Sequence, residues 1–285
     1  MRNSMQRPLC LTLLCAASIA LAAPAQANDL QDQNSTGLTY ADTADLALGA
    51  PVAAHVTLRR ARPLRPEQAV GVPPGHSRFL VDADLTALIR GESGTPAQVR
   101  YLADFPNDPR GRPARLQRGS QWLVFARPVP GRPGELQLIA ADAAIPYDAA
   151  TAERVREIIR AELEGDAPPA IDAIGRAFHV PGALPGTGET QFFLQTSRSQ
   201  PISITVAREA QAEPRWFVSL SEFVDAGASQ PHPDSLLWYR LACFLPAQLP
   251  AAAFADAREH AQAIQRDYQL VRAGLGACPR NRTRG

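Results

Sequence analysis

The sequence predicts a mainly β protein of the α+β class. We expect a small antiparallel barrel with one flanking helix, followed by an α+β domain with an antiparallel sheet and a long C-terminal helix. Several short stretches alternate apolar and polar residues, which indicates strands with one buried face. Two later stretches repeat their apolar residues every three or four positions, as amphipathic helices do. The 26 prolines and the 20% of charged residues are typical of a globular chain with many turns.

The stretch before the first strand predicts export. Residues 1–27 have the features of a signal peptide: Arg2 and Arg7 form a basic start, residues 9–22 are apolar, and a small-x-small pattern ends at Ala27, where we expect cleavage. The apolar run is too short to span a bilayer and no later run is longer, so no transmembrane segment is expected. The expected location is the periplasm or the outside of the cell.

Behind the signal peptide we expect a tail and two domains. Residues 28–43 contain few apolar side chains, which predicts a mobile tail. Residues 44–165 are expected to hold the barrel and its helix, and residues 166–285 the α+β domain. The boundary falls in the stretch 164–170, "EGDAPPA", which has two prolines and a glycine.

Five strands and a helix make up the predicted barrel domain. Alternation begins at Val52, continues in a long strand that Gly91 ends, and repeats over 99–105; residues 121–142 give two short strands joined by a Pro/Gly turn. The residues expected on the inner face of the first three strands are Val52, Ala54, Val56, Leu58, Phe79, Val81, Ala83, Leu85, Ala87, Ile89, Val99, Tyr101, Ala103 and Phe105.

The helix that follows is expected to be capped by Asp148 or Thr151 and to end at Gly165. Its apolar stripe consists of Val155, Ile158, Ile159 and Leu163.

The strand that ends in Gly91, the strand "VRYLADFP" and the glycine-led strand "RGSQWLVFA" give residues 44–165 a resemblance to the OB-type barrels of netrin-like and tissue-inhibitor-like domains. This resemblance implies an OB-like barrel and protease inhibition as an activity. Such inhibitors chelate a protease metal through an N-terminal cysteine, and the expected mature start at Asn28 has none, so that mechanism does not carry over. The whole chain also resembles uncharacterised exported proteins of Gram-negative bacteria that share a "WYRLACFLP" segment and a C-terminal cysteine.

In the second domain we expect three strands, over residues 190–196, 201–209 and 215–225, and then a long helix over 251–272 that starts after Pro250 and ends before Gly274. The inner residues expected on the strands are Ile202, Ile204, Val206, Trp216, Val218 and Leu220. The docking stripe expected on the helix is Phe254, Ala257, Ala261, Ile264, Tyr268 and Val271.

Residues 236–245 fit a doubly buried strand and a short helix equally well. The choice bears on Cys243 and Cys278, for which an oxidising compartment favours a disulfide over a buried thiol or a nucleophile. A straight helix over 251–272 would be roughly 33 Å long, and the chain after it can return at most about 20 Å. Cys278 should therefore reach Cys243 on a strand and fall short of it on a helix, unless the long helix unwinds early.

Charge and composition exclude several functions. The chain has 29 basic and 28 acidic residues, and cleavage of the signal peptide would leave 27 against 28, so no nucleic-acid partner is expected. Every basic residue is an arginine, which excludes Schiff-base lysines and the lysine of a phosphate-binding loop. The one basic cluster, "LRRARPLR" over residues 58–65, is interpreted as a solvated strand end.

No catalytic, metal or cofactor site follows from local motifs. The five histidines (His55, His76, His179, His232, His260) are scattered without metal-ligand spacing. We therefore expect an exported, non-catalytic binding or envelope-associated protein, with an unknown protein or small ligand in the barrel loops or in an interdomain groove. The alternative is a hydrolase whose site is assembled from distant residues, with His232, Asp234 and Ser221 as the candidate catalytic residues. A second alternative is a protease-inhibitor-like barrel. The oligomeric state is left open.

Overall fold

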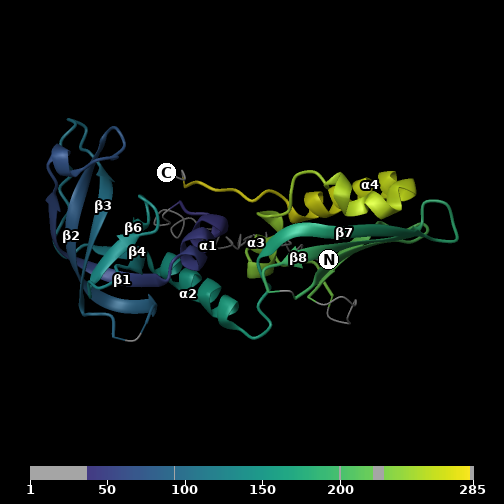
Figure 1. Ribbon diagram of the computed structural model, residues 1–285, viewed down its shortest axis with the longest axis horizontal. Helices are drawn as coiled ribbons and strands as arrows, with labels where there is room; N and C mark the ends of the chain where they lie inside the picture. The colour runs from purple at the N-terminus through teal and green to yellow at the C-terminus, as the bar shows by residue number, and fades with distance from the viewer. Residues whose placement is uncertain (1–36, 93, 199, 221–227, 283–285) are drawn as a thin grey trace, which may run out of the picture. The chain divides into compact units, whose positions relative to one another are not determined.

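The structure is a computed structural model that describes residues 37–92, 94–198, 200–220 and 228–282. It has a barrel part and a sheet part, which come in this order along the chain (Figure 1). The expected fold class, a small barrel with a helix followed by an antiparallel sheet with a C-terminal helix, is confirmed. The expected signal peptide, its cleavage after Ala27 and the tail up to residue 36 lie outside the described residues.

The barrel part contains β1 (Val52–Pro63), β2 (His76–Arg90), β3 (Gln98–Pro106), β4 (Gln121–Pro128), β5 (Glu135–Leu138) and β6 (Ala144–Pro146). The strand order is β1-β2-β3-β5-β4, and β1 pairs with β4, which closes the barrel; β6 pairs with β4 as well. Strands β3 and β5 are parallel and the other pairs are antiparallel. The barrel is thus mixed rather than antiparallel as expected, because a closed ring of five strands cannot alternate direction at every step.

The interior of the barrel follows the alternation of the sequence as far as Ala83. The expected inner residues of β1 and β3 and the first three of β2 are buried in one cluster. Beyond Ala83 the prediction is only partly right. Leu85 is half-buried against the barrel cluster, whereas Ile89 packs against a second core cluster, which contains the buried residues of α1, α2 and the sheet part. Register shifts between β1 and β2 explain the difference, because each shift moves the following side chains to another face.

Helix α1 (Tyr40–Gly49) begins inside the range that we expected to be a mobile tail. Its capping box is visible in the sequence. The Thr39 hydroxyl accepts from the Asp42 amide at 3.0 Å, and Asp42 accepts from the Thr39 amide at 3.1 Å. The buried face consists mainly of small side chains such as Ala41, Ala44 and Ala47, which give a weak apolar pattern.

Helix α2 (Ala149–Leu163) begins where the sequence places it. The carboxylate of Asp148 accepts from the Thr151 amide at 2.7 Å, and this bond caps the first turn. Val155, Ile158 and Ile159 are buried as expected, whereas Leu163 in the last turn is 71% exposed. The prediction of Leu163 as a core residue was therefore wrong.

The sheet part contains β7 (Ile171–Pro181), β8 (Gly188–Thr196), β9 (Ile202–Arg208) and β10 (Arg215–Ser219), in the antiparallel order β10-β9-β8-β7. Ile202, Ile204 and Val206 of β9 are buried as the alternation predicts, and Ser203 and Thr205 on the opposite face are buried as well, so β9 is covered on both faces. Leu220 lies beyond the end of β10 and is 40% exposed, so it is not an inner residue.

Three helical segments follow: α3 (Leu236–Ala242), the 3-10 segment η3 (Ala251–His260) and α4 (Ala261–Leu275). The stretch 236–245 is thus helical. The expected continuous helix from 251 to 272 is interrupted, because Phe254 and Ala257 leave helical geometry, with ψ of 27° and 37°. Apart from Ala261, which is only partly buried, the expected stripe is buried, and α4 lies along one face of the sheet (Figure 1).

Gly274, expected just beyond the helix, lies inside α4, and the helix ends at Gly276 with φ of 71°. A Cβ on Gly274 would come within 2.5 Å of the Trp216 indole nitrogen. The glycine therefore permits the close packing of α4 on the sheet.

We expect Gly274→Ala to destabilise the protein by about 1–3 kcal/mol, because the extra methyl group overpacks the contact with Trp216. The free energy of unfolding in urea measures the effect. Gly165→Ala is the matched control, since a Cβ at Gly165 meets no atom within 4 Å. Equal unfolding midpoints for the two variants would contradict the packing argument.

Candidate functional site

The residues of the hydrolase alternative do not form a site in the described chain. His232 is exposed and its Nδ1 donates to the carbonyl oxygen of Pro233 at 2.6 Å. Asp234 is exposed in the left-handed region with φ of 58°, and no hydrogen bond joins it to His232 within the described residues. Ser221 lies outside the described residues. The hydrolase alternative stays a prediction.

Of the other histidines, His179 and His260 lie edge to face with ring centroids 5.4 Å apart, and His55 and His76 have separate partners. His55 stacks on Tyr147, with ring centroids 3.9 Å apart, and hydrogen-bonds Gln121 at 3.0 Å. His76 donates to the carbonyl oxygen of Pro74. In the part of the chain that the structure describes, no three His, Cys, Asp or Glu residues converge as metal ligands would.

A buried polar cluster that the sequence analysis did not find joins α4 to the sheet. Asp267 and Thr190 are each 0% exposed. The Thr190 hydroxyl donates to Asp267, and Arg208 donates to the same carboxylate from Nε at 2.6 Å. Since the hydroxyl proton is used, His179 donates from Nδ1 to the Thr190 oxygen at 2.9 Å.

Burial lowers the pKa of His179, although the charge of Asp267 acts in the opposite direction. The imidazole is therefore mainly neutral at neutral pH. Because Thr190 and Asp267 are shielded from solvent, no substrate can reach the hydroxyl. The cluster is suited to fixing α4 on the sheet and not to nucleophilic catalysis.

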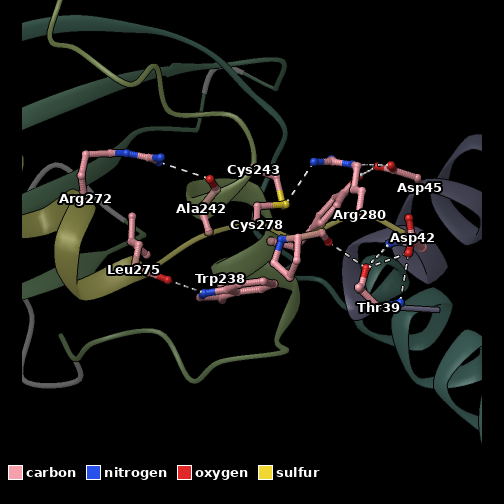
Figure 2. The surroundings of a disulfide bond; sticks show 12 residues. Thr39, Asp42, Asp45, Trp238, Ala242, Cys243, Arg272, Leu275, Cys278 and Arg280 are labelled. Atoms are coloured by element: carbon pink, nitrogen blue, oxygen red, sulfur yellow. Dashed lines mark hydrogen bonds and ion pairs between the residues drawn. A yellow bond between two sulfur atoms is a disulfide. The ribbon is translucent and has the colours of Figure 1, made fainter. Parts of the chain in front are cut away.

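Cys243 is a half-cystine: it forms a disulfide with Cys278, 35 residues later in the chain (Figure 2). Our expectation that this bridge requires a strand at 236–245 was wrong, because Cys243 caps the end of the helix α3. The early unwinding that we named as the exception explains the contact. Residues 251–260 are kinked, and α4 alone, with its 15 residues, is roughly 22 Å long, so the chain after Leu275 can return to α3.

The residues that follow α4, 276–282, form what we call the C-terminal segment, and they bind α1. Arg280 pairs with Asp45 at 2.7 Å, and the Tyr239 hydroxyl donates to the same carboxylate at 2.6 Å. The backbone amides of Asn281 and Arg282 donate to Asp42 at 2.8 and 3.1 Å. Figure 2 shows this segment running from Cys278 to the acidic side chains of α1.

Further contacts hold the C-terminal segment, among them a bond of 2.7 Å from the Asn281 side-chain amide to the Gly37 carbonyl. Thr39 donates from its hydroxyl to the Pro279 carbonyl at 2.8 Å, and Arg282 pairs with Asp142 at 2.6 Å. Burial alone would raise the pKa of Asp42, but the backbone hydrogen bonds to its carboxylate outweigh burial and hold the pKa below its ordinary value. The carboxylate is thus ionised at neutral pH and remains an acceptor for the segment.

The main groove is a cavity of about 720 Å³ on the outside of the barrel, lined by β2, β3, β5 and the loop from β4 to β5. Its centre is aliphatic: Leu80 and Leu102 are neighbours in the β2–β3 register, and Leu138 comes from β5, while Leu136 touches the groove but is 6% exposed and packs in the barrel core. Leu102 is 44% exposed. The volume lies within the range of about 300–1,000 Å³ that is usual for ligand pockets.

Ion pairs flank this aliphatic centre. On one side Arg78 makes two hydrogen bonds to Asp104, at 2.7 and 2.8 Å. On the other side Arg100 pairs with Asp82 at 2.7 Å. Both arginines are thus held in place by carboxylates on the neighbouring strand, which gives the groove defined polar margins.

A second cavity of about 570 Å³, the side groove, shares Arg100 and Glu135 with the main groove. Arg59 and Arg60 from the basic cluster "LRRARPLR" line it together with Arg118. Arg60 and Arg118 form no ion pair with any described residue. The cluster that we interpreted as a solvated strand end therefore contributes uncompensated positive charge to a cavity.

The comparisons with known proteins assign no family: no family model matches the chain, and no curated protein is significantly similar to it in sequence. Among the described residues, no helix is both long and apolar enough to cross a membrane. The disulfide is consistent with an oxidising compartment, where such bonds persist.

Proposed function

We propose that the protein is an exported, non-catalytic binding protein that takes its ligand in the main groove. The observation that carries this proposal is the aliphatic cavity flanked by ion-paired arginines. OB-type barrels bind their ligands at strands two and three and at the loop between strands four and five; β2, β3 and the β4–β5 loop line the main groove here, together with β5 and residues 140–141. The expected signal peptide and the disulfide support a location outside the cytoplasm.

The lining of the main groove supports binding rather than catalysis. No serine, threonine, cysteine or histidine is among the described residues that line it. Tyr101 is 3% exposed, and burial raises the pKa of its hydroxyl, so it stays protonated. The arginines and carboxylates at the margins are paired with each other. Groups of this kind orient a ligand, but they supply no nucleophile.

A neutral apolar dye tests the proposal. We expect N-phenyl-1-naphthylamine to bind the parent protein at one saturable site with a rise in fluorescence. Leu102→Asp should weaken this binding at least tenfold, because it places a charge on the aliphatic floor. The variant should fold, since Leu102 points outward and is partly exposed.

Leu163→Asp is the matched control, because Leu163 is an exposed leucine that does not line the groove. It should bind the dye as the parent does. Absence of saturable binding to the parent, or equal affinity in the parent and Leu102→Asp, would refute a ligand site in the main groove.

A further inference from the structure

One wall of the main groove is the edge of a strand. In β3, the Arg100 amide donates to the Gly134 carbonyl on the β5 side at 2.8 Å. Just beyond β3, the Asn107 amide donates to the Gly75 carbonyl on the β2 side at 2.8 Å. Backbone groups alternate in direction along a strand. Leu102 and Asp104 therefore direct their backbone groups toward β5, as Arg100 does.

Only part of this edge of β3 is paired with another strand. The pairing of β3 with β5 consists of Arg100 with Glu135 and Tyr101 with Leu136. Further along, β5 pairs with β4, where Leu138 faces Ala126, and β6 also pairs with β4. In a parallel ladder the bridge of Tyr101 with Leu136 engages the Leu102 amide, so the groups of this edge left without a strand partner among the described residues are the Leu102 carbonyl and the Asp104 amide and carbonyl.

The free edge faces the cavity. Four consecutive residues of β3, from Tyr101 to Asp104, line the main groove together with Gln137 and Leu138. Consecutive residues of a strand point to opposite faces of the sheet, so a cavity that touches all of them lies at the edge of the strand and not over one face. The groove thus combines unpaired backbone groups with an aliphatic surface.

We propose that the ligand of the main groove is an extended peptide segment that adds as a strand to residues 102–105 of β3. This proposal rests on the proposed function and specifies its ligand. Strand addition uses main-chain hydrogen bonds for affinity and alternate side chains for specificity. Every second side chain of the peptide packs against the leucines of the groove.

The charges of the two grooves indicate an acidic peptide. Six arginines and three carboxylates line them: Arg59, Arg60, Arg78, Arg100, Arg118 and Arg132 against Asp82, Asp104 and Glu135. The whole chain, in contrast, is nearly neutral, with 29 basic and 28 acidic residues. Because Arg59 also pairs with Asp84, which lines neither groove, Arg60 and Arg118 are the two arginines left without an ion pair among the described residues, and this local excess favours acidic side chains in the partner.

Calorimetry with synthetic peptides tests the proposal. The first peptide has eight residues, alternates valine and aspartate and is blocked at both ends. The second has the same sequence, with the backbone nitrogen methylated at alternate residues on the edge that would pair with β3. We expect the first to bind and the second to bind at least tenfold more weakly, because methylation removes main-chain hydrogen bonds and keeps the side chains. Binding of the first should also slow hydrogen exchange of the Asp104 amide at least tenfold.

Charge is tested separately. Arg60→Ala/Arg118→Ala should weaken binding of the acidic peptide at least tenfold at low salt. Arg176→Ala/Arg258→Ala, which removes two exposed arginines outside both grooves, should leave it unchanged. A peptide that alternates valine and arginine should bind at least tenfold more weakly than the acidic one.

The outcomes separate this proposal from the proposed function. If the neutral dye binds in the groove but the acidic peptide does not bind, or binds equally well when methylated, strand addition is refuted and groove binding stands. Equal affinity for acidic and basic peptides would overturn the acidic preference. If neither the dye nor the peptide binds, both proposals fall.

Discussion

Replacing Asp267 by alanine is expected to destabilise the protein by about 3–5 kcal/mol, the cost of removing one partner of a buried ion pair. The carboxylate is 1% exposed and accepts bonds from Thr190, Arg208 and Arg266. Without it, Arg208 keeps a charge that is 17% exposed and has no partner at the contact between α4 and the sheet. Urea unfolding followed by tryptophan fluorescence measures the loss.

Arg266→Ala provides the control for this prediction. Its side chain contacts the same carboxylate at 3.3 Å but is 51% exposed, so its removal should cost less than about 1 kcal/mol. The loss of unfolding free energy in Thr190→Val should lie between those of Asp267→Ala and Arg266→Ala, since this variant leaves His179 without its acceptor. If Asp267→Ala and Arg266→Ala were equally stable, Asp267 would not be the centre of the cluster.

The second large effect is expected for Cys243→Ala/Cys278→Ala. Removal of the bridge frees a loop of 35 residues in the unfolded chain, which corresponds to a loss of about 4 kcal/mol by loop entropy. The native state should change too, because Cys278 anchors the C-terminal segment to α3. Hydrogen exchange of the Asn281 and Arg282 amides, which are bonded to Asp42, should become faster.

Asp45→Asn separates the loss of the disulfide from the loss of the contact between the C-terminal segment and α1. It keeps the bridge but weakens the pairing with Arg280 and should cost about 1 kcal/mol. The amides of Asn281 and Arg282 should then stay more protected than in the double cysteine variant. An unchanged unfolding midpoint in the double cysteine variant would show that the bridge does not stabilise the fold.

The elements that the sequence predicts best are those whose pattern is uninterrupted. Strand β3 alternates without a bulge, and α2 combines a capping aspartate with an apolar stripe. Strand β7 was missed because its buried residues Ile171, Ile174 and Ala177 are three positions apart. Register shifts against β8 produce this spacing, and it resembles neither a regular strand nor a helix of useful length.

Contacts between distant segments were harder to predict. The break at Phe254 and Ala257 has no glycine or proline as a signal, so a straight helix was the simplest expectation. Because we expected a straight helix, we also expected that Cys278 could not reach Cys243 if residues 236–245 were helical, and this expectation was wrong. The capping box at Thr39 was readable, but one of the segments that bind α1 comes more than two hundred residues later, as the separation of 240 between Thr39 and Pro279 shows.

The grooves depend on where two strands stop pairing. The basic cluster at Arg59 and Arg60 was visible, and so was the alternation that places Leu80 and Leu102 outside the barrel. The sequence does not show that β5 leaves β3 after Leu136 while it stays paired with β4 as far as Leu138. The cavity and its open edge therefore emerge only from the tertiary structure.

The attachment of the C-terminal segment to α1 has a consequence for biosynthesis. A chain that emerges from a ribosome or a translocon begins with its N-terminal end, so α1 is present long before Arg280 and Asn281. Until those last residues appear, the carboxylates of Asp42 and Asp45 lack these partners. Contacts between residues so far apart form late in folding. The attachment of the C-terminal segment is thus a post-translational event, whereas α1 can pack on α2 as soon as residues 149–163 have emerged.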